Sequence, residues 1–200
     1  MQHLYNPNYQ NQDLAVRSAA ALDKISDTLK ALLWTGQKES GFSPLQLKLL
    51  LFIAYHESKY NTVSQLVEEF QVTKATISDC IKALEKQKLL TKVLNHRDNR
   101  RFHIELTEKG TQTVSEIKPF ANPLIQVLQS EKSEDLEKLY SSMFSILSKM
   151  NKSKQLNLKR SCSDCNAYRS DGINHAFCMQ LRIQLRDKDR RIDCPKYQSN

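Results

Sequence analysis

Glycine is scarce in this sequence: only four glycines occur among 200 residues, and they form no glycine-rich loop of the kind that cradles phosphates. No apolar run approaches the ~20 residues that cross a lipid bilayer. The polar N-terminal segment lacks the basic and apolar regions of a secretory signal. No nucleophilic triad is evident. These absences disfavour an enzyme, a membrane protein and a secreted protein, and we expect a chain that works in the cytoplasm.

A basic surplus and an uneven set of cysteines are what the sequence does have. The net charge is +8 and the pI about 9.2, a balance that favours polyanionic partners. Residues 151–200 hold 11 Lys and Arg against 5 Asp, together with four of the five cysteines. In a reducing compartment, clustered cysteines indicate a metal or redox site more than disulfides.

Hydrophobic periodicity predicts helices along most of the first 150 residues. Apolar residues spaced by three and four predict a helix over residues 14–35. Ser43 and Pro44 suit the start of a second helix, whose almost wholly apolar body we expect to be buried. Thr107 and Ser133 begin two later helices, and we expect prolines to bend the first of them, which carries apolar residues to position 120.

Two short helices joined by a tight turn are predicted between these longer ones. Thr62 and Gln65 form a capping-box pattern at the start of the first short helix. Gln71 and Val72 form the turn, and Thr73 caps the second helix, whose apolar face is Ile77, Ile81 and Leu84. This arrangement is typical of a helix-turn-helix.

Two strand-like segments follow, at residues 89–95 and 101–106. Between them, residues 96–100 read as a polar, basic hairpin tip, that is, a wing. The sequence therefore predicts a mainly helical chain with a small β-wing: a winged helix-turn-helix flanked by N- and C-terminal dimerisation helices.

This order of elements resembles the MarR family of bacterial transcription regulators over about residues 12–150. The resemblance is most specific in residues 43–110, through the segments FSPLQLKLLLFIAY, TVSQLVEEFQVTKATISDCIKALEKQKLLTK and NHRDNRRFHIELTEKG. It implies a dimeric regulator that reads a palindromic operator in double-stranded DNA. Asp79 stands where many members of the family carry arginine on the recognition helix.

Short polar or cationic side chains near the start of the second helix suit the reading of a major groove. The expected contacts there are Thr73, Lys74, Ala75, Thr76 and Ser78. Arginines on a hairpin tip suit a narrow minor groove, and the wing offers Arg97, Arg100 and Arg101. A solvated helix face and a hydrophilic turn are the alternative interpretations. We expect the DNA contacts in these two elements and not in the more basic tail.

The helix over 14–35 and the helix from Ser133 carry apolar stripes that lie outside the small winged-helix core. In the resembled family such helices pack across a two-fold axis, so we expect a homodimer whose recognition helices lie ~34 Å apart. The alternative is that both helices close over their own chain. The expected domains are a flexible N-terminus (1–11), a DNA-binding and dimerisation domain (12–150), a linker (151–161) and a metal-binding module (162–200).

The tail cysteines follow the pattern C-x2-C-x12-C-x15-C, formed by Cys162, Cys165, Cys178 and Cys194. Four thiolates complete a tetrahedral zinc site or a four-cysteine iron–sulfur cluster. A single close pair and a proline after the last cysteine favour a cluster, 4Fe–4S, over zinc. Disulfides and free thiols are the remaining alternatives, and His175 is a further candidate ligand.

These observations predict a DNA-binding transcription regulator, a dimeric repressor, whose cysteine site senses redox or metal state. A second hypothesis keeps the regulator but makes the tail a structural zinc module and assigns the signal to a small-molecule effector. A third is a thiol oxidoreductase using Cys162 and Cys165. It is disfavoured because the chain lacks the βαβ pattern that commonly accompanies such sites.

Overall fold

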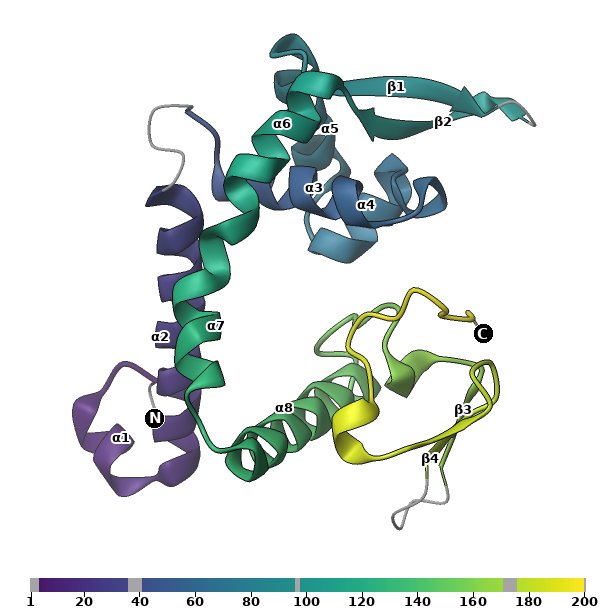
Figure 1. The fold of residues 1–200 in the computed structure, drawn as a ribbon. Coiled ribbons are helices and arrows are strands. Elements are labelled where there is room, and N and C mark those ends of the chain that lie inside the picture. The colour runs from purple at the N-terminus through teal and green to yellow at the C-terminus, as the bar shows by residue number, and fades with distance from the viewer. Residues whose placement is uncertain (1–3, 36–40, 96–97, 171–175, 200) are drawn as a thin grey trace. The chain divides into compact units, whose positions relative to one another are not determined.

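The computed structural model describes residues 4–35, 41–95, 98–170 and 176–199. This part of the chain is mainly helical and carries two small antiparallel sheets (Figure 1). The fold class therefore agrees with the prediction from the sequence. Among the described helices, none is long and apolar enough to cross a membrane.

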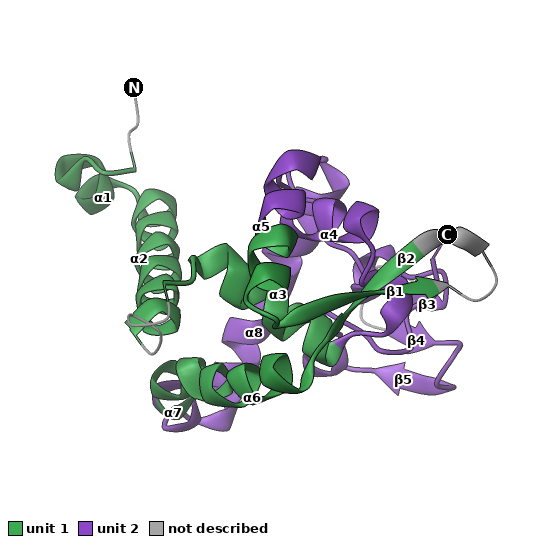
Figure 2. Cartoon of the chain, turned by 90° about the horizontal axis from the view of Figure 1, so that it is seen from above, with its two compact units in different colours: residues 1–55, 80–126 green, residues 56–79, 127–200 purple. Residues whose placement is uncertain are grey.

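The chain forms two compact units, which Figure 2 distinguishes by colour: residues 1–55 with 80–126, and residues 56–79 with 127–200. The predicted bounds of the DNA-binding domain, the linker and the tail stay predictions beside this grouping. Residues 56–79 include the first helix and the turn of the helix-turn-helix, and they group with the tail. We call the two groups the winged-helix unit and the tail unit.

The winged-helix unit begins with two helices. Its elements are, in chain order, α1 (Pro7–Gln12), α2 (Leu14–Thr35), α3 (Pro44–Tyr55), the C-terminal part of α5 (Lys74–Lys86), β1 (Leu90–Asn95), β2 (Asp98–Leu106), α6 (Glu108–Ile117), the 3-10 helix η2 (Lys118–Ala121) and most of α7 (Asn122–Gln129). The N-terminal segment contains α1, and its predicted flexibility stays a prediction. Asn6 caps that helix by accepting the backbone N–H of Asn8.

Helix α3 forms the centre of the winged-helix unit, as its apolar sequence predicts. Ser43 caps it reciprocally: its hydroxyl accepts the N–H of Gln46 at 3.2 Å, and the Gln46 side chain accepts the N–H of Ser43 at 2.8 Å. Helices α2 and α6 and strand β2 contact α3. The buried core of the unit includes Leu47, Leu49, Leu50, Ile104, Val114 and Ile117.

Strands β1 and β2 form an antiparallel hairpin, which is the predicted wing. Leu90 pairs with Leu106, and Lys92 pairs with Ile104. The second strand begins at Asp98, three residues earlier than predicted, so Asp98, Asn99 and Arg100 belong to the strand and not to the tip.

Helix α6 starts where the sequence predicts, because Thr107 caps it by accepting the N–H of Gly110 at 3.0 Å. The helix was expected to continue, bent, as far as Phe120. It ends instead at Ile117, and the chain passes through η2 into α7. Pro119 explains the break, because proline has no N–H to donate and its ring clashes with the preceding turn. Pro123 is tolerated in the first turn of α7.

The tail unit contains the first helix of the helix-turn-helix and a small β-structure. Its elements are the 3-10 helix η1 (Ser58–Tyr60), α4 (Val63–Phe70), the N-terminal part of α5, α8 (Ser133–Lys152), η3 (Cys162–Asp164), β3 (Tyr168–Ser170), β4 (Ala176–Cys178), β5 (Ile183–Leu185) and η4 (Asp187–Asp189). The three strands form one antiparallel sheet in the order β3-β4-β5. A small cluster of buried residues supports it: Phe144 from α8, with Cys162, Ala176 and Leu185.

Candidate nucleic-acid interface and cysteine cluster

The turn between α4 and α5 is formed as predicted. Gln71 ends α4 in the left-handed conformation, with φ of 51°. Thr73 then accepts the N–H of Thr76 at 3.1 Å, and the two hydroxyls are hydrogen-bonded at 2.8 Å. Thr73 therefore has a structural role as the cap of α5, and its hydroxyl is already engaged.

The first turn of α5 presents the side chains that the sequence assigned to a major groove. Lys74 and Ala75 are exposed, whereas Thr76 and Ser78 are half-buried. Ile77, between them, is fully buried. The helix thus separates an apolar face from a face that starts with a lysine at the positive end of the helix dipole.

The predicted wing contacts are placed only in part. Arg97 lies outside the described residues. Arg100 and Arg101 lie in β2, but their side chains are not described. At the base of the wing, Lys92 forms a partly exposed ion pair with Glu85 of α5 at 2.7 Å, which links this strand to α5.

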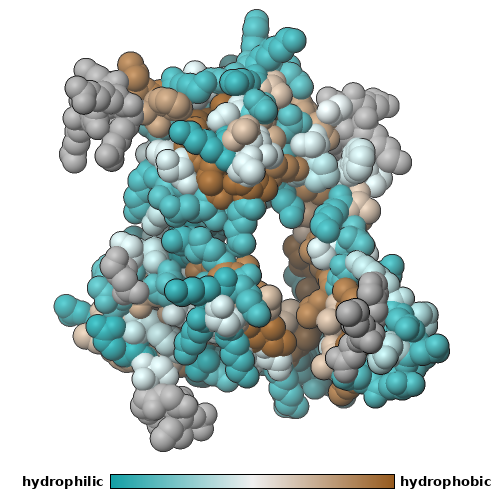
Figure 3. Space-filling model, turned by 180° about the vertical axis from the view of Figure 1, so that it is seen from behind, coloured by the Kyte–Doolittle hydropathy of each residue, from teal (hydrophilic) through white to brown (hydrophobic). Residues whose placement is uncertain are grey.

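The two predicted dimerisation helices differ in the structure. On α2, Leu22 and Ile25 are nearly half exposed, and Figure 3 shows uncovered apolar surface where α2 and α7 lie. On α8, part of the expected stripe packs within its own unit. Phe144 is buried in the tail cluster, and the Tyr140 hydroxyl donates to the carbonyl of Arg190 at 2.6 Å.

The four tail cysteines are free thiols in one small region. Cys162 and Cys194 are buried, whereas Cys165 and Cys178 are half-buried. Burial raises the pKa of the Cys162 thiol, the three neighbouring thiols raise it further, and the N–H of Arg191 opposes them. A raised pKa is opposite to what a nucleophilic thiol needs. The buried Cys162 thiol therefore lacks the exposure and the lowered pKa expected of a reactive thiol.

Several N–H groups point at these sulfurs. The backbone N–H of Arg191 donates to Cys162 at 3.2 Å, and that of Gln198 donates to Cys165 at 3.5 Å. The Arg191 guanidinium donates to Cys194 at 3.6 Å. In the described residues, no group of three or more His, Cys, Asp or Glu side chains is arranged to hold a metal ion. His175 lies outside the described residues.

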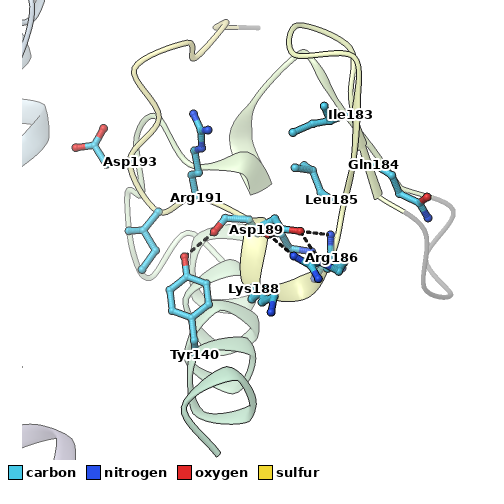
Figure 4. Close-up of a pocket in the computed structure, with 11 residues that line it drawn as sticks. Tyr140, Ile183, Gln184, Leu185, Arg186, Lys188, Asp189, Arg191 and Asp193 are labelled. Atoms are coloured by element: carbon cyan, nitrogen blue, oxygen red, sulfur yellow. Dashed lines mark hydrogen bonds and ion pairs between the residues drawn. The ribbon is translucent and has the colours of Figure 1, made fainter. Parts of the chain in front are cut away.

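Some basic residues of the tail form ion pairs within the tail unit. A groove of about 880 Å³ lies beside Tyr140. Figure 4 shows Arg186 bonded to Asp189 in its lining, and the two side chains are 2.9 Å apart. Arg190 pairs with Asp187 at 2.8 Å, and Lys188 pairs with Glu137 of α8. Part of the positive charge of the tail thus has internal partners.

One buried cluster was missed in the sequence. Arg160, in the expected linker, is only 5% exposed, and its guanidinium bonds both Asp193 of the tail and Glu69 of α4. Asp193 also bonds His56 at 2.8 Å. Burial alone would raise the pKa of Asp193, but the hydrogen bonds from His56 and Arg160 hold it well below its ordinary value. No local pattern marks these contacts, because the partners are far apart in sequence.

A helix-turn-helix followed by a two-stranded wing defines a winged-helix fold. Residues 23–117 match the sequence model of the family described as transcriptional regulator SarA/Rot. The chain is 27% identical, over 135 residues, to the organic hydroperoxide resistance transcriptional regulator of Bacillus subtilis (strain 168), a match that covers 62% of this chain and 90% of that protein.

Solved structures give the same fold. S. aureus MepR in a DNA-binding conformation has a TM-score of 0.58 and 25% identity, covering 69% of this chain and 98% of that chain. The transcriptional regulator PA3341 has a TM-score of 0.59 and 24% identity, covering 67% and 98%. The matched family model, the Bacillus subtilis protein and PA3341 are described as transcriptional regulators, and the solved structures share the winged-helix fold of this chain.

Proposed function

We propose that this chain is a sequence-specific transcription regulator, a repressor, that binds double-stranded DNA in the cytoplasm as a homodimer. The observation that carries the proposal is the exposed first turn of α5 in a winged-helix fold. S. aureus MepR, which has this fold, has been solved as a complex with DNA, and the match has a TM-score of 0.57 with 23% identity.

The proposed contacts follow from side-chain chemistry. Lys74 carries a positive charge at the start of α5, where it suits a phosphate or a guanine edge. Thr73, Ala75, Thr76 and Ser78 are short enough to let the helix enter a major groove. Arg97, Arg100 and Arg101 of the wing suit the negative potential of a narrow minor groove.

Exposed apolar side chains on α2 support the proposed dimer. Leu22 and Ile25, at helical spacing, remain 46% and 44% exposed within the described part of the winged-helix unit. Burying such a face against a second copy would place two recognition helices about one turn of DNA apart, around 34 Å, and would match a palindrome.

DNA selection tests this proposal directly. The full chain is incubated with a pool of random duplexes of about 30 base pairs, and bound DNA is amplified through several rounds. We expect enrichment of one palindromic sequence that binds at least about 1000-fold more tightly than unrelated DNA. Failure to enrich any sequence would contradict the proposal, and enrichment of an asymmetric site would contradict the dimer.

We further propose that Cys162, Cys165, Cys178 and Cys194 bind an iron–sulfur cluster, 4Fe–4S, or a zinc ion, and that this site senses redox or metal state. Three facts support it: the four thiols are free neighbours, N–H groups point at their sulfurs, and the buried cluster of the tail is very small. A segment with so little apolar core commonly needs a bound metal to fold. The same small core supports the second hypothesis, in which the tail is purely structural and a small molecule is the effector.

Metal analysis of the anaerobically purified chain separates these possibilities. A broad visible absorption band with iron and sulfide in matching amounts indicates a cluster. A colourless protein with one zinc per chain indicates the zinc site, and an operator affinity that is the same with and without zinc makes the tail structural. Absence of both metals after reconstitution would contradict metal binding.

A further inference from the structure

Arg160 joins the cysteine cluster to the helix-turn-helix. Its guanidinium forms two hydrogen bonds with the Asp193 carboxylate, from Nε to Oδ1 at 2.8 Å and from Nη2 to Oδ2 at 3.1 Å. The same guanidinium pairs with Oε2 of Glu69 at 2.9 Å and lies over the ring of Tyr60, 5.2 Å from its centre. Arg160 is buried, while the side chains of Glu69 and Asp193 are 26% and 44% exposed, so water and salt screen these contacts less than they screen fully exposed ion pairs.

We call the contacts of Arg160 with Asp193 and Glu69 the Arg160 joint. On one side, this joint is next to two of the cysteines in the chain. Arg160 lies two residues before Cys162, and Asp193 directly precedes Cys194. The carbonyl of Arg160 accepts the N–H of Cys194 at 2.9 Å. A metal centre bound by both Cys162 and Cys194 would therefore restrain the backbone from which Arg160 and Asp193 project.

On the other side, the joint contacts the helix-turn-helix through α4. Glu69 lies in the last turn of α4, two residues before Gln71, which makes the left-handed turn into α5. Thr73 and Lys74, at the start of the recognition helix, follow that turn. Asp193 also holds His56, ahead of α4, so the carboxylate contacts both ends of this segment directly or through Arg160.

We propose that the Arg160–Glu69 contact transmits the state of the four-cysteine site to the helix-turn-helix, so that loading the site orders α4 and tightens operator binding. This inference rests on the proposed function, since it needs both a loaded cysteine site and a DNA ligand. Arg160 and Glu69 are positioning residues: neither touches the metal or the DNA. Coupling of this kind requires a contact that differs between two states, and a buried, bidentate arginine supplies one with fixed geometry.

A neighbouring ion pair provides a matched control. Lys159 and Glu68 are adjacent to Arg160 and Glu69 and also pair, at 3.5 Å, but their side chains are 37% and 47% exposed. Exposed pairs contribute little. Glu69→Gln and Glu68→Gln make the same chemical change on the same helix, and only the first weakens the buried joint. Arg160→Lys is a second test variant, which keeps the positive charge but loses the planar fork that bridges two carboxylates.

The experiment measures operator affinity for wild type and each variant in two states. One state is reconstituted anaerobically with ferrous iron and sulfide, or with Zn²⁺ if that is the metal found, and the other is stripped with a chelator. Hydrogen exchange of the α4 amides is measured in the same two states. For wild type we expect loading to tighten binding at least about fivefold, within the usual range of allosteric coupling, and to slow exchange in α4.

Glu69→Gln and Arg160→Lys should load the same amount of metal, but the ratio of loaded to stripped affinity should fall to within about twofold of one. The slowing of exchange in α4 should disappear with it. Glu68→Gln should behave as wild type. A wild-type ratio of one, or a full ratio in Glu69→Gln and Arg160→Lys, would overturn the inference. A chain that neither loads metal nor binds the selected DNA would instead contradict the proposed function.

Discussion

The winged-helix unit and the tail unit are held together by different interactions. In the winged-helix unit, helices begin at side-chain caps and pack around fully buried aliphatic residues such as Leu47, Leu50 and Ile104. In the tail, three-residue strands lie around a small cluster that includes a cysteine, and ion pairs such as Arg160–Asp193 and Lys188–Glu137 link its segments. Apolar burial is enough to account for the first unit, whereas the second requires polar contacts and, as we propose, a bound metal.

Removal of a tail cysteine should produce the largest difference in stability between the two units. Cys162→Ser replaces a buried thiol that receives an N–H from Arg191, and we expect it to abolish metal loading. Structural zinc contributes roughly 10–16 kcal/mol of binding free energy in small zinc-finger peptides, far more than so small a core replaces. Hydrogen exchange should therefore accelerate throughout the tail, with little change in α3 or α6.

Cys80→Ser is the matched control, because Cys80 lies on α5 outside the cluster. It should leave metal content and exchange in the tail unchanged. If Cys162→Ser loosens α3 and α6 as much as the tail, the two units do not differ in the way described.

Gly110→Ala should produce the opposite pattern. A Cβ at this position would lie 2.1 Å from the backbone oxygen of Leu89, and that oxygen cannot move without disturbing the base of the wing. Overpacking of this kind costs about 1–3 kcal/mol or more. We expect urea unfolding of the winged-helix unit to shift by at least about 2 kcal/mol, with metal content unchanged.

Ser115→Ala is the control for this variant, because Ser115 is exposed on the same helix. Its expected effect is within about 0.5 kcal/mol. A similarly small effect of Gly110→Ala would mean that the approach of α6 to Leu89 is not needed for stability.

The same contrast explains what could be predicted from the sequence. Caps at Ser43, Thr62, Thr73 and Thr107 were found where local patterns placed them, because each involves residues three positions apart. A bend of one continuous helix was expected near Pro119, whereas the structure ends α6 at Ile117 and continues through η2 into a new helix, α7. The Arg160 joint could not be predicted, since its partners lie 33 and 91 positions away and only the folded chain brings them together. For the same reason, the grouping of α4 with the tail left no signal in the sequence.

Lys74→Ala should change DNA binding without altering either unit. Lys74 is exposed at the start of α5, and no shift of stability is expected from its removal. We expect operator affinity to fall about tenfold, which corresponds to about 1.4 kcal/mol. If Lys74 contacts a phosphate, the salt dependence of binding should lose about one ion and all sequences should weaken alike.

Lys138→Ala serves as the control, because this lysine is also exposed but lies on α8. It should retain operator affinity within about twofold. Equal losses in the two variants would indicate a general effect of charge and would remove Lys74 from the proposed interface.

The smallest expected effect is the loss of stability when one helix cap is removed from each unit. Thr62→Ala removes the acceptor for the N–H of Gln65 at 3.4 Å on α4, and Ser43→Ala removes the acceptor for the N–H of Gln46 at 3.2 Å on α3. Each loss should cost about 0.5–1 kcal/mol. If the units unfold separately, Thr62→Ala lowers the urea midpoint of the tail transition only and Ser43→Ala that of the winged-helix transition only. A single transition that both variants shift equally would show that the helix-turn-helix, which contributes to both units through α4 and α5, makes the chain unfold as one cooperative body.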